Sequence, residues 1–113
     1  MSSNLPAERT PKVLVIGASG YLGQALLVEL ANRNIDHVGT SRRPLEGSGM
    51  VYCDVLDKES IVQAIQTTGA THIIHSAGMV SHRPEDAERV WKIHVTGTEN
   101  VCSVCLDASV ERV

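Results

Sequence analysis

Short apolar runs alternate with helical patterns along the chain. The run Lys12–Ile16 (KVLVI) ends at a glycine and is typical of a strand buried on both faces of a parallel sheet. From Tyr21 to Asn32 leucines recur at helical spacing, and Ser19 is expected to cap this helix. The same pattern predicts strands at Ile35–Ser41, Met50–Cys53 and Thr71–His75, helices at Asp57–Thr67 and Pro84–Ala108, and the first residues of another strand at Val110–Val113.

The last predicted helix has one face that we expect to be covered. That face is formed by Val90, His94, Gly97, Val101 and Val104, which recur every three or four positions. Strands and helices alternate from residue 12 onward, which favours a parallel sheet with right-handed crossovers. Residues 1–11 are polar, contain two prolines and are predicted to form a flexible tail.

Composition narrows the class of protein. A chain of 113 residues is long enough for one small domain, and 42% hydrophobic with 20% charged residues excludes a disordered or collagen-like chain. The net charge of −3 gives no sign of a nucleic-acid or membrane surface. No apolar run approaches the roughly 20 residues that span a bilayer, and the first ten residues lack a signal-peptide core. These features predict a cytoplasmic protein.

The turn between the first strand and the first helix carries the main chemical signal. Its glycines follow the pattern G-x-x-G-x-x-G: Gly17 allows the tight turn, Gly20 lets backbone approach a pyrophosphate, and Gly23 lets the helix pack on the sheet. Free N–H groups at the helix start would face the phosphates. A plain glycine-bearing turn is the alternative, but the strand–turn–helix context favours a dinucleotide site at Gly17, Ser19, Gly20, Tyr21, Leu22 and Gly23.

The end of the second predicted strand bears on the choice of dinucleotide. An NAD site usually has an acidic residue there, which binds the ribose 2′-hydroxyl. This chain instead reads Thr-Ser-Arg-Arg, and the guanidinium of Arg42 can pair with a 2′-phosphate. Solvated loop charges are the alternative. The missing acid together with the added bases favours NADP over NAD.

Four motifs are distinctive: the glycine turn, Cys53–Asp57, His75–Gly78 and His94–Val101. Together they resemble the extended short-chain dehydrogenase/reductase family, the NAD(P)-dependent epimerases and dehydratases, in which the last motif reads N-V-x-G-T-x-N-V. Within that family, the segments Thr40–Pro44 and Ala77–Val80 are most similar to the dihydroflavonol-reductase and hydroxysteroid-dehydrogenase branch. The resemblance implies an α/β Rossmann-type doubly wound sheet with strand order 3-2-1-4 and a stub of strand five. It also implies that the adenine is contacted by Asp54 and Val55, and the cofactor ribose by Ala77 and Gly78.

Two positions depart from the family pattern. His94 stands where the family usually has asparagine, although a histidine can supply one similar hydrogen bond. The family's catalytic tyrosine is followed four positions later by a lysine, but Ala25 and Leu56 follow Tyr21 and Tyr52. We therefore assign no catalytic residue and expect residues 12–113 to be the cofactor part of a longer oxidoreductase or epimerase, truncated before the catalytic segment. The small-molecule substrate would bind only in a full-length relative, and the helix 84–108 would provide a dimer contact.

The cysteine and histidine pairs give weaker evidence of a functional site. Cys102 and Cys105 form a C-x-x-C near the end of a helix, where buried packing is expected rather than redox chemistry. His72 and His75 lie three apart in a strand, on opposite faces, and cannot jointly bind one metal. The alternatives that stay open are a non-catalytic nucleotide-binding regulatory module on the same fold and a thiol-redox protein.

Overall fold

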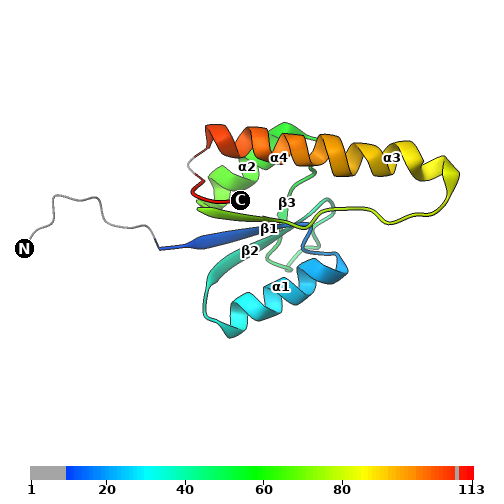
Figure 1. The fold of residues 1–113 in the computed structure, drawn as a ribbon. Helices are drawn as coiled ribbons and strands as arrows, with labels where there is room; N and C mark the ends of the chain where they lie inside the picture. Colours follow the sequence, from blue (N-terminus) through cyan, green and yellow to red (C-terminus); the bar gives the residue numbers. More distant parts are fainter. Residues whose placement is uncertain (1–9, 109) are drawn as a thin grey trace, which may run out of the picture.

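The computed structural model describes residues 10–108 and 110–113, and within them a parallel sheet is covered by helices on both faces (Figure 1). The strands are β1 Lys12–Ile16, β2 Asp36–Ser41, β3 Val51–Tyr52 and β4 His72–His75. Their order is β3-β2-β1-β4, and every pairing is parallel. The predicted order 3-2-1-4 is confirmed.

Strand β1 is apolar at successive positions because both of its faces are buried. Successive side chains of a strand point to opposite faces of the sheet. Leu14 and Ile16 join the core beneath α2 Lys58–Thr68 and α4 Gly97–Asp107, whereas Val13 and Val15 pack toward α1 Tyr21–Asn32. Figure 1 shows α1 on one face and α2 and α4 on the other. The two small cores therefore share one strand.

The last predicted helix is continuous but not uniform. It comprises the 3-10 turn η1 Pro84–Asp86, α3 Ala87–Trp91, the π-helical turn η2 Lys92–Thr96, and α4. The wider π turn changes which side chains face the sheet, so Ile93 is buried while His94 is exposed. The prediction that His94 lies on the covered face was wrong, and Val90 is only half-buried. The prediction was correct for Gly97, Val101 and Val104, which are buried.

Helix caps differ from one another. The Asp57 side chain accepts a hydrogen bond from the Ser60 N–H and caps α2. The N-cap residue of α1 is Gly20, with no side-chain hydrogen bond. The prediction that Ser19 caps α1 was wrong because its hydroxyl turns toward β2, where it accepts a 3.4 Å hydrogen bond from Ser41.

The predicted start of another strand lies beside β4. Arg112 forms a parallel bridge with His72, and its carbonyl accepts a 2.9 Å hydrogen bond from the Ile73 N–H. Of the predicted tail, Thr10 and Pro11 are exposed and irregular, and residues 1–9 lie outside the described residues. No helix in residues 10–108 and 110–113 is long and apolar enough to cross a membrane.

Backbone packs directly on backbone at the glycine turn. Gly17 has φ +83°, and a Cβ on it would lie 2.6 Å from the Ala77 backbone. A Cβ on Gly23 would lie 2.3 Å from the Gly17 carbonyl oxygen and 2.6 Å from Ala18 Cα. A Cβ on Gly20 would meet only the Gly17 oxygen, at 3.4 Å, which is an ordinary contact. The first and third glycines are therefore needed by the fold, and the second is not.

We expect Gly23→Ala to lower the free energy of unfolding by about 1–3 kcal/mol, because overpacking against backbone cannot be relieved by a side-chain rotation. Gly20→Ala is the matched control and should cost about 1 kcal/mol or less, the loss of a glycine at an N-cap. Thermal unfolding followed by circular dichroism measures both. Equal melting temperatures for Gly23→Ala and the unchanged chain would show that α1 can move away from the turn.

Candidate functional site

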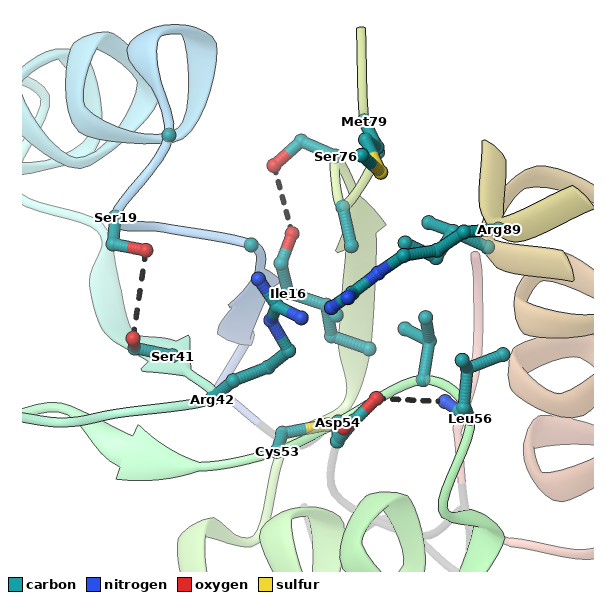
Figure 2. Close-up of a pocket in the computed structure, with 16 residues that line it drawn as sticks. Ile16, Ser19, Ser41, Arg42, Cys53, Asp54, Leu56, Ser76, Met79 and Arg89 are labelled. Carbon is teal, nitrogen blue, oxygen red and sulfur yellow. Dashed lines mark hydrogen bonds between the residues drawn. The ribbon is translucent and has the colours of Figure 1, made fainter. Parts of the chain in front are cut away.

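A cavity of about 360 Å³ opens at the carboxyl ends of the strands (Figure 2). Four loops and the last helix meet there, because parallel strands deliver their carboxyl ends to one edge of the sheet. The lining residues come from the glycine turn, the end of β2, the segment after β3, the loop after β4, and the segment α3–η2.

The cavity brings together most of the residues predicted from the sequence. Its lining includes Gly17, Ser19, Gly20, Arg42, Asp54, Val55, Ala77 and Gly78. Three predicted residues lie outside the lining. Tyr21 and Leu22 are 98% and 62% exposed on α1, and Gly23 is buried against the Gly17–Ala18 backbone. For all the predicted residues, these three included, contact with a ligand stays a prediction.

The glycine turn presents backbone rather than side chains. The Ala18 N–H donates to the Thr40 carbonyl at 2.8 Å, which ties the turn to β2. The Gly20 N–H donates to the Gly17 carbonyl at 3.2 Å, and the Gln24 N–H donates to the Gly20 carbonyl at 3.0 Å. Because no side chain caps α1, the positive end of its dipole faces the turn without a local counter-charge. This arrangement suits an anion.

The segment after β3 is held from two directions. On one side, the Asp54 N–H donates a hydrogen bond to Ser60 Oγ at 2.9 Å, and the Asp54 carboxylate accepts a 2.9 Å hydrogen bond from the Leu56 N–H. From the other side, Asn100 Nδ2 donates to the Val55 carbonyl at 2.9 Å. A Cβ on Gly97 would lie 2.6 Å from Val55 Cγ2. Gly97 and Asn100, both in the motif on the long helix, therefore position the segment after β3.

The loop after β4 is held by Ser76 and His94. The Ser76 hydroxyl and N–H both donate to the Ile16 carbonyl, at 2.7 and 2.9 Å. His94 Nε2 lies 3.2 Å from the Met79 nitrogen and 2.9 Å from the Met79 oxygen, so its tautomer decides whether it accepts or donates. Its ring also lies against Gly78, where a Cβ would come within 2.9 Å of Cε1. Histidine at this position therefore still contacts the loop.

Arg89 lines the cavity although it was not predicted from the sequence. It extends from α3 into the cavity, on the side opposite Arg42 (Figure 2). Spacing along the helix could not identify Arg89, because Ile93, one helical turn later, is placed in the cavity wall only by the structure. The helix start that carries it is anchored by a polar cluster.

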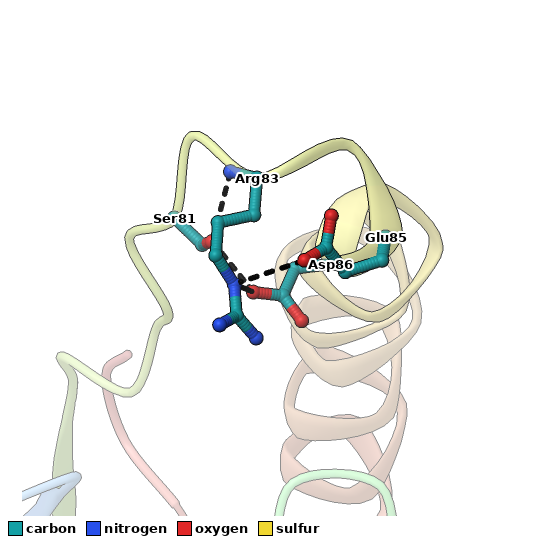
Figure 3. Close-up of polar contacts among 4 residues, drawn as sticks. All are labelled: Ser81, Arg83, Glu85 and Asp86. Atoms are coloured by element: carbon teal, nitrogen blue, oxygen red, sulfur yellow. Dashed lines mark hydrogen bonds and ion pairs between the residues drawn. The ribbon is translucent and has the colours of Figure 1, made fainter.

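That cluster comprises Ser81, Arg83, Glu85 and Asp86 (Figure 3). The Ser81 hydroxyl donates to the Asp86 carboxylate at 2.7 Å, and Arg83 Nε lies 3.2 Å from the same oxygen and 3.4 Å from Glu85. The hydrogen bonds from Ser81 and then from Arg83 lower the pKa of Asp86. Arg83 is thus neutralised within its own segment.

The three cysteines lie in different environments. Cys105 is buried and its burial raises the pKa of its thiol, whereas Cys102 is exposed, so the prediction of two buried thiols was wrong for Cys102. Burial also raises the pKa of Cys53, at the edge of the cavity, to about 11. Within the described residues the cysteines are free, and no group of three potential metal-binding side chains comes together.

Comparison with known proteins identifies the family. The sequence model of the NAD dependent epimerase/dehydratase family matches residues 13–113, and the chain therefore belongs to this family. Among curated relatives, cinnamoyl-CoA reductase 1 of Oryza sativa subsp. japonica is 32% identical over 100% of this chain and 37% of its own length. The chain spans about a third of the length of the curated relatives that it matches.

Solved structures agree with this assignment. A short-chain dehydrogenase/reductase superfamily protein from Agrobacterium tumefaciens, with bound NAD, matches with a TM-score of 0.75 and 26% identity. The match covers 88% of this chain and 30% of that protein. A GalE-like L-threonine dehydrogenase from Cupriavidus necator, in the holo form, matches with a TM-score of 0.80 over 91% of this chain and 36% of that one. At 24% identity, this second likeness concerns the fold.

We expect the stability of the chain to fall as the pH is lowered from 7 to 5, in part because of His75. Burial and then the nearby His94 lower the pKa of His75, whose Nδ1 is buried without a hydrogen-bond partner in the described part of the chain. In the unfolded chain this imidazole titrates near 6.5. Below that pH the unfolded state binds more protons, so stability is complete above about 6.5 and declines as the pH falls.

His75→Gln should flatten this pH dependence while retaining a polar group near Thr98 Oγ1, which lies 3.1 Å from His75 Nε2. His82→Gln, which changes an exposed loop histidine, is the control. Melting temperatures at pH 5 to 7.5 provide the measurement. Identical slopes for the unchanged chain and His75→Gln would exclude His75 as a source of the pH dependence.

Thiol accessibility gives a further prediction. At pH 8, a thiol reagent should label Cys102 rapidly, because Cys102 is exposed, while Cys53 and Cys105 react only after unfolding. Cys102→Ser should therefore remove the rapid phase. Two equivalents of rapid labelling, or a disulfide formed under mild oxidation without loss of structure, would support the thiol-redox alternative.

Proposed function

We propose that this chain binds a nicotinamide adenine dinucleotide, with NADP preferred over NAD, as the cofactor-binding part of an oxidoreductase or epimerase. The observation that carries this proposal is that one cavity is lined both by the glycine turn, where α1 begins without a side-chain cap, and by Arg42. The end of β2 carries no acidic residue. An NAD site usually has an acid there.

The residues fit such a cofactor. Gly20 leaves the approach to the helix start free of side chains, which suits a pyrophosphate. Arg42 also lines a second cavity of about 510 Å³ next to the first, with Ser19, Ser41 and Arg43. The groups that line both cavities, the Arg42 guanidinium and the Ser19 and Ser41 hydroxyls, suit a 2′-phosphate, and Arg43 adds positive charge from the second cavity. We assign the pyrophosphate to Gly17–Gly23, the adenine to Asp54 and Val55, and the ribose to Ala77 and Gly78.

The bound dinucleotide would supply or accept a hydride, and a reaction at a hydroxyl or ketone also needs a proton donor. Neither tyrosine in the chain is suited to that role. Tyr21 is 98% exposed, and Tyr52 donates a 3.5 Å hydrogen bond to Asp57 outside the cavity. Partial burial and then the Asp57 carboxylate raise the pKa of Tyr52, opposite to what a proton relay needs. We therefore propose that this chain holds the cofactor and does not reduce substrate by itself.

Three finer expectations remain proposals. A non-catalytic nucleotide-binding module would use the same cavity without a substrate. A dimer through the segment 84–108 is supported by the outer apolar side chains of Trp91 and Leu106, which are 65% and 86% exposed. A cytoplasmic location is consistent with the absence of a membrane-spanning helix in the described residues.

The chain should bind NADPH more tightly than NADH, and Arg42→Asp should abolish or reverse the preference. A charge-assisted hydrogen bond contributes about 1.5–3 kcal/mol, so we expect roughly a 10- to 100-fold loss for NADPH. A carboxylate at position 42 would repel the 2′-phosphate but could accept from the 2′-hydroxyl of NADH. Isothermal titration calorimetry measures the four affinities.

Arg33→Asp is the control, because it makes the same change in net charge at an exposed arginine that pairs with Glu29 on α1. It should leave both affinities within about twofold. Equal affinity of the unchanged chain for NADPH and NADH would refute the preference for NADP. If neither binds, the proposed function itself is wrong.

A further inference from the structure

Two guanidinium groups enter the cavity without a partner of opposite charge. Figure 2 shows Arg42 reaching in from the end of β2 and Arg89 from α3. Within residues 10–108 and 110–113, neither side chain makes a hydrogen bond or an ion pair. Other basic side chains do: Arg33 pairs with Glu29, and Lys92 with Glu88. Asp86 attracts Arg89 through space, but its carboxylate is already bonded to Ser81 and Arg83.

The charge balance of the cavity is positive. Asp54 is the one acidic residue among the lining side chains, and its carboxylate accepts the Leu56 N–H. The Cys53 thiol stays neutral, because burial raises its pKa to about 11. The positive end of the α1 dipole adds to the two arginines. A cavity with two unpaired arginines and one acid favours an occupant that carries a doubly charged group.

The location of Arg89 points to the adenosine end of that occupant. Its guanidinium shares a cavity wall with Asp54 and Leu56, after β3, and faces the arginine at the end of β2 (Figure 2). The glycine turn already provides backbone N–H groups for a pyrophosphate. The helix start below Arg89 is fixed by the Ser81–Asp86 contacts, so only its side chain needs to adjust.

We propose that Arg89 binds the 2′-phosphate of NADP from the side opposite Arg42, so that two arginines on separate elements hold one phosphate group. This inference rests on the proposed function and adds a second residue that determines specificity. Because Arg89 is exposed and unpaired, removing its guanidinium should not affect folding. It should instead lower the affinity for a ligand with a 2′-phosphate.

The test compares NADP⁺, NAD⁺ and 2′,5′-ADP by isothermal titration calorimetry on the whole 113-residue chain. Arg89→Gln should weaken binding of NADP⁺ and 2′,5′-ADP about tenfold, the lower end expected for a hydrogen bond to a charged group. Binding of NAD⁺ should change less than about twofold. Arg89→Lys should be intermediate, because a lysine keeps the charge but not the planar fork.

Arg33→Gln is the matched control, with the same loss of one positive charge at the exposed C-cap of α1. Arg42→Gln and the double variant complete a cycle. The double variant should lose less than the product of the two single losses, since both arginines hold the same group. Circular dichroism should give the same melting temperature for Arg89→Gln and the unchanged chain.

Different failures are distinguishable. If Arg89→Gln weakens NADP⁺ and NAD⁺ equally, Arg89 contacts the pyrophosphate, and the inference is wrong. If NADP⁺ binding depends on Arg42 but not on Arg89, the inference is wrong while the proposed function stands. If the unchanged chain binds none of the three nucleotides, both are wrong.

Discussion

Close contact between backbone segments at the glycine turn is the constraint on which the rest of the structure depends. Gly17 leaves β1 with a positive φ and lies directly against the backbone of Ala77, while Gly23 brings α1 onto Gly17 and Ala18. No side chain fits between these segments. The start of α1 and the loop after β4 are therefore fixed relative to each other, and the cavity lies where they meet. The same closeness leaves backbone amides as the main polar groups of the turn.

The second organising feature is charge. Where acidic side chains neutralise arginines, they do so within one short segment, as in the cluster of Ser81, Arg83, Glu85 and Asp86. The arginines of the cavity, Arg42 and Arg89, have no such partner in the described part of the chain. A protein gains little from holding two like charges in one cavity unless a ligand of opposite charge binds there. Two unpaired arginines that line one cavity are thus an electrostatic sign of a binding site.

The long helix connects these two features. Gly97 and Asn100 hold the segment after β3, His94 contacts the loop after β4, and Arg89 extends into the cavity. The π turn between α3 and α4 allows this, because it turns His94 toward the loop and Ile93 toward the core. One helix therefore supports three walls of the cavity. π turns within helices are often found at functional sites for this reason.

The sequence by itself determined the strands and helices, the glycine turn and the basic residues directly after β2, because these depend on local patterns. The order of the sheet and the cavity residues after β3 and β4 followed from the resemblance of four sequence motifs to the family. Only the tertiary structure decided the direction of the Ser19 hydroxyl, the exposure of His94 and Cys102, and the presence of Arg89 in the cavity. Each of these is set by an element distant in sequence or by the π turn, which shifts the helical register. A periodic pattern assumes one uniform helix and cannot reveal that shift.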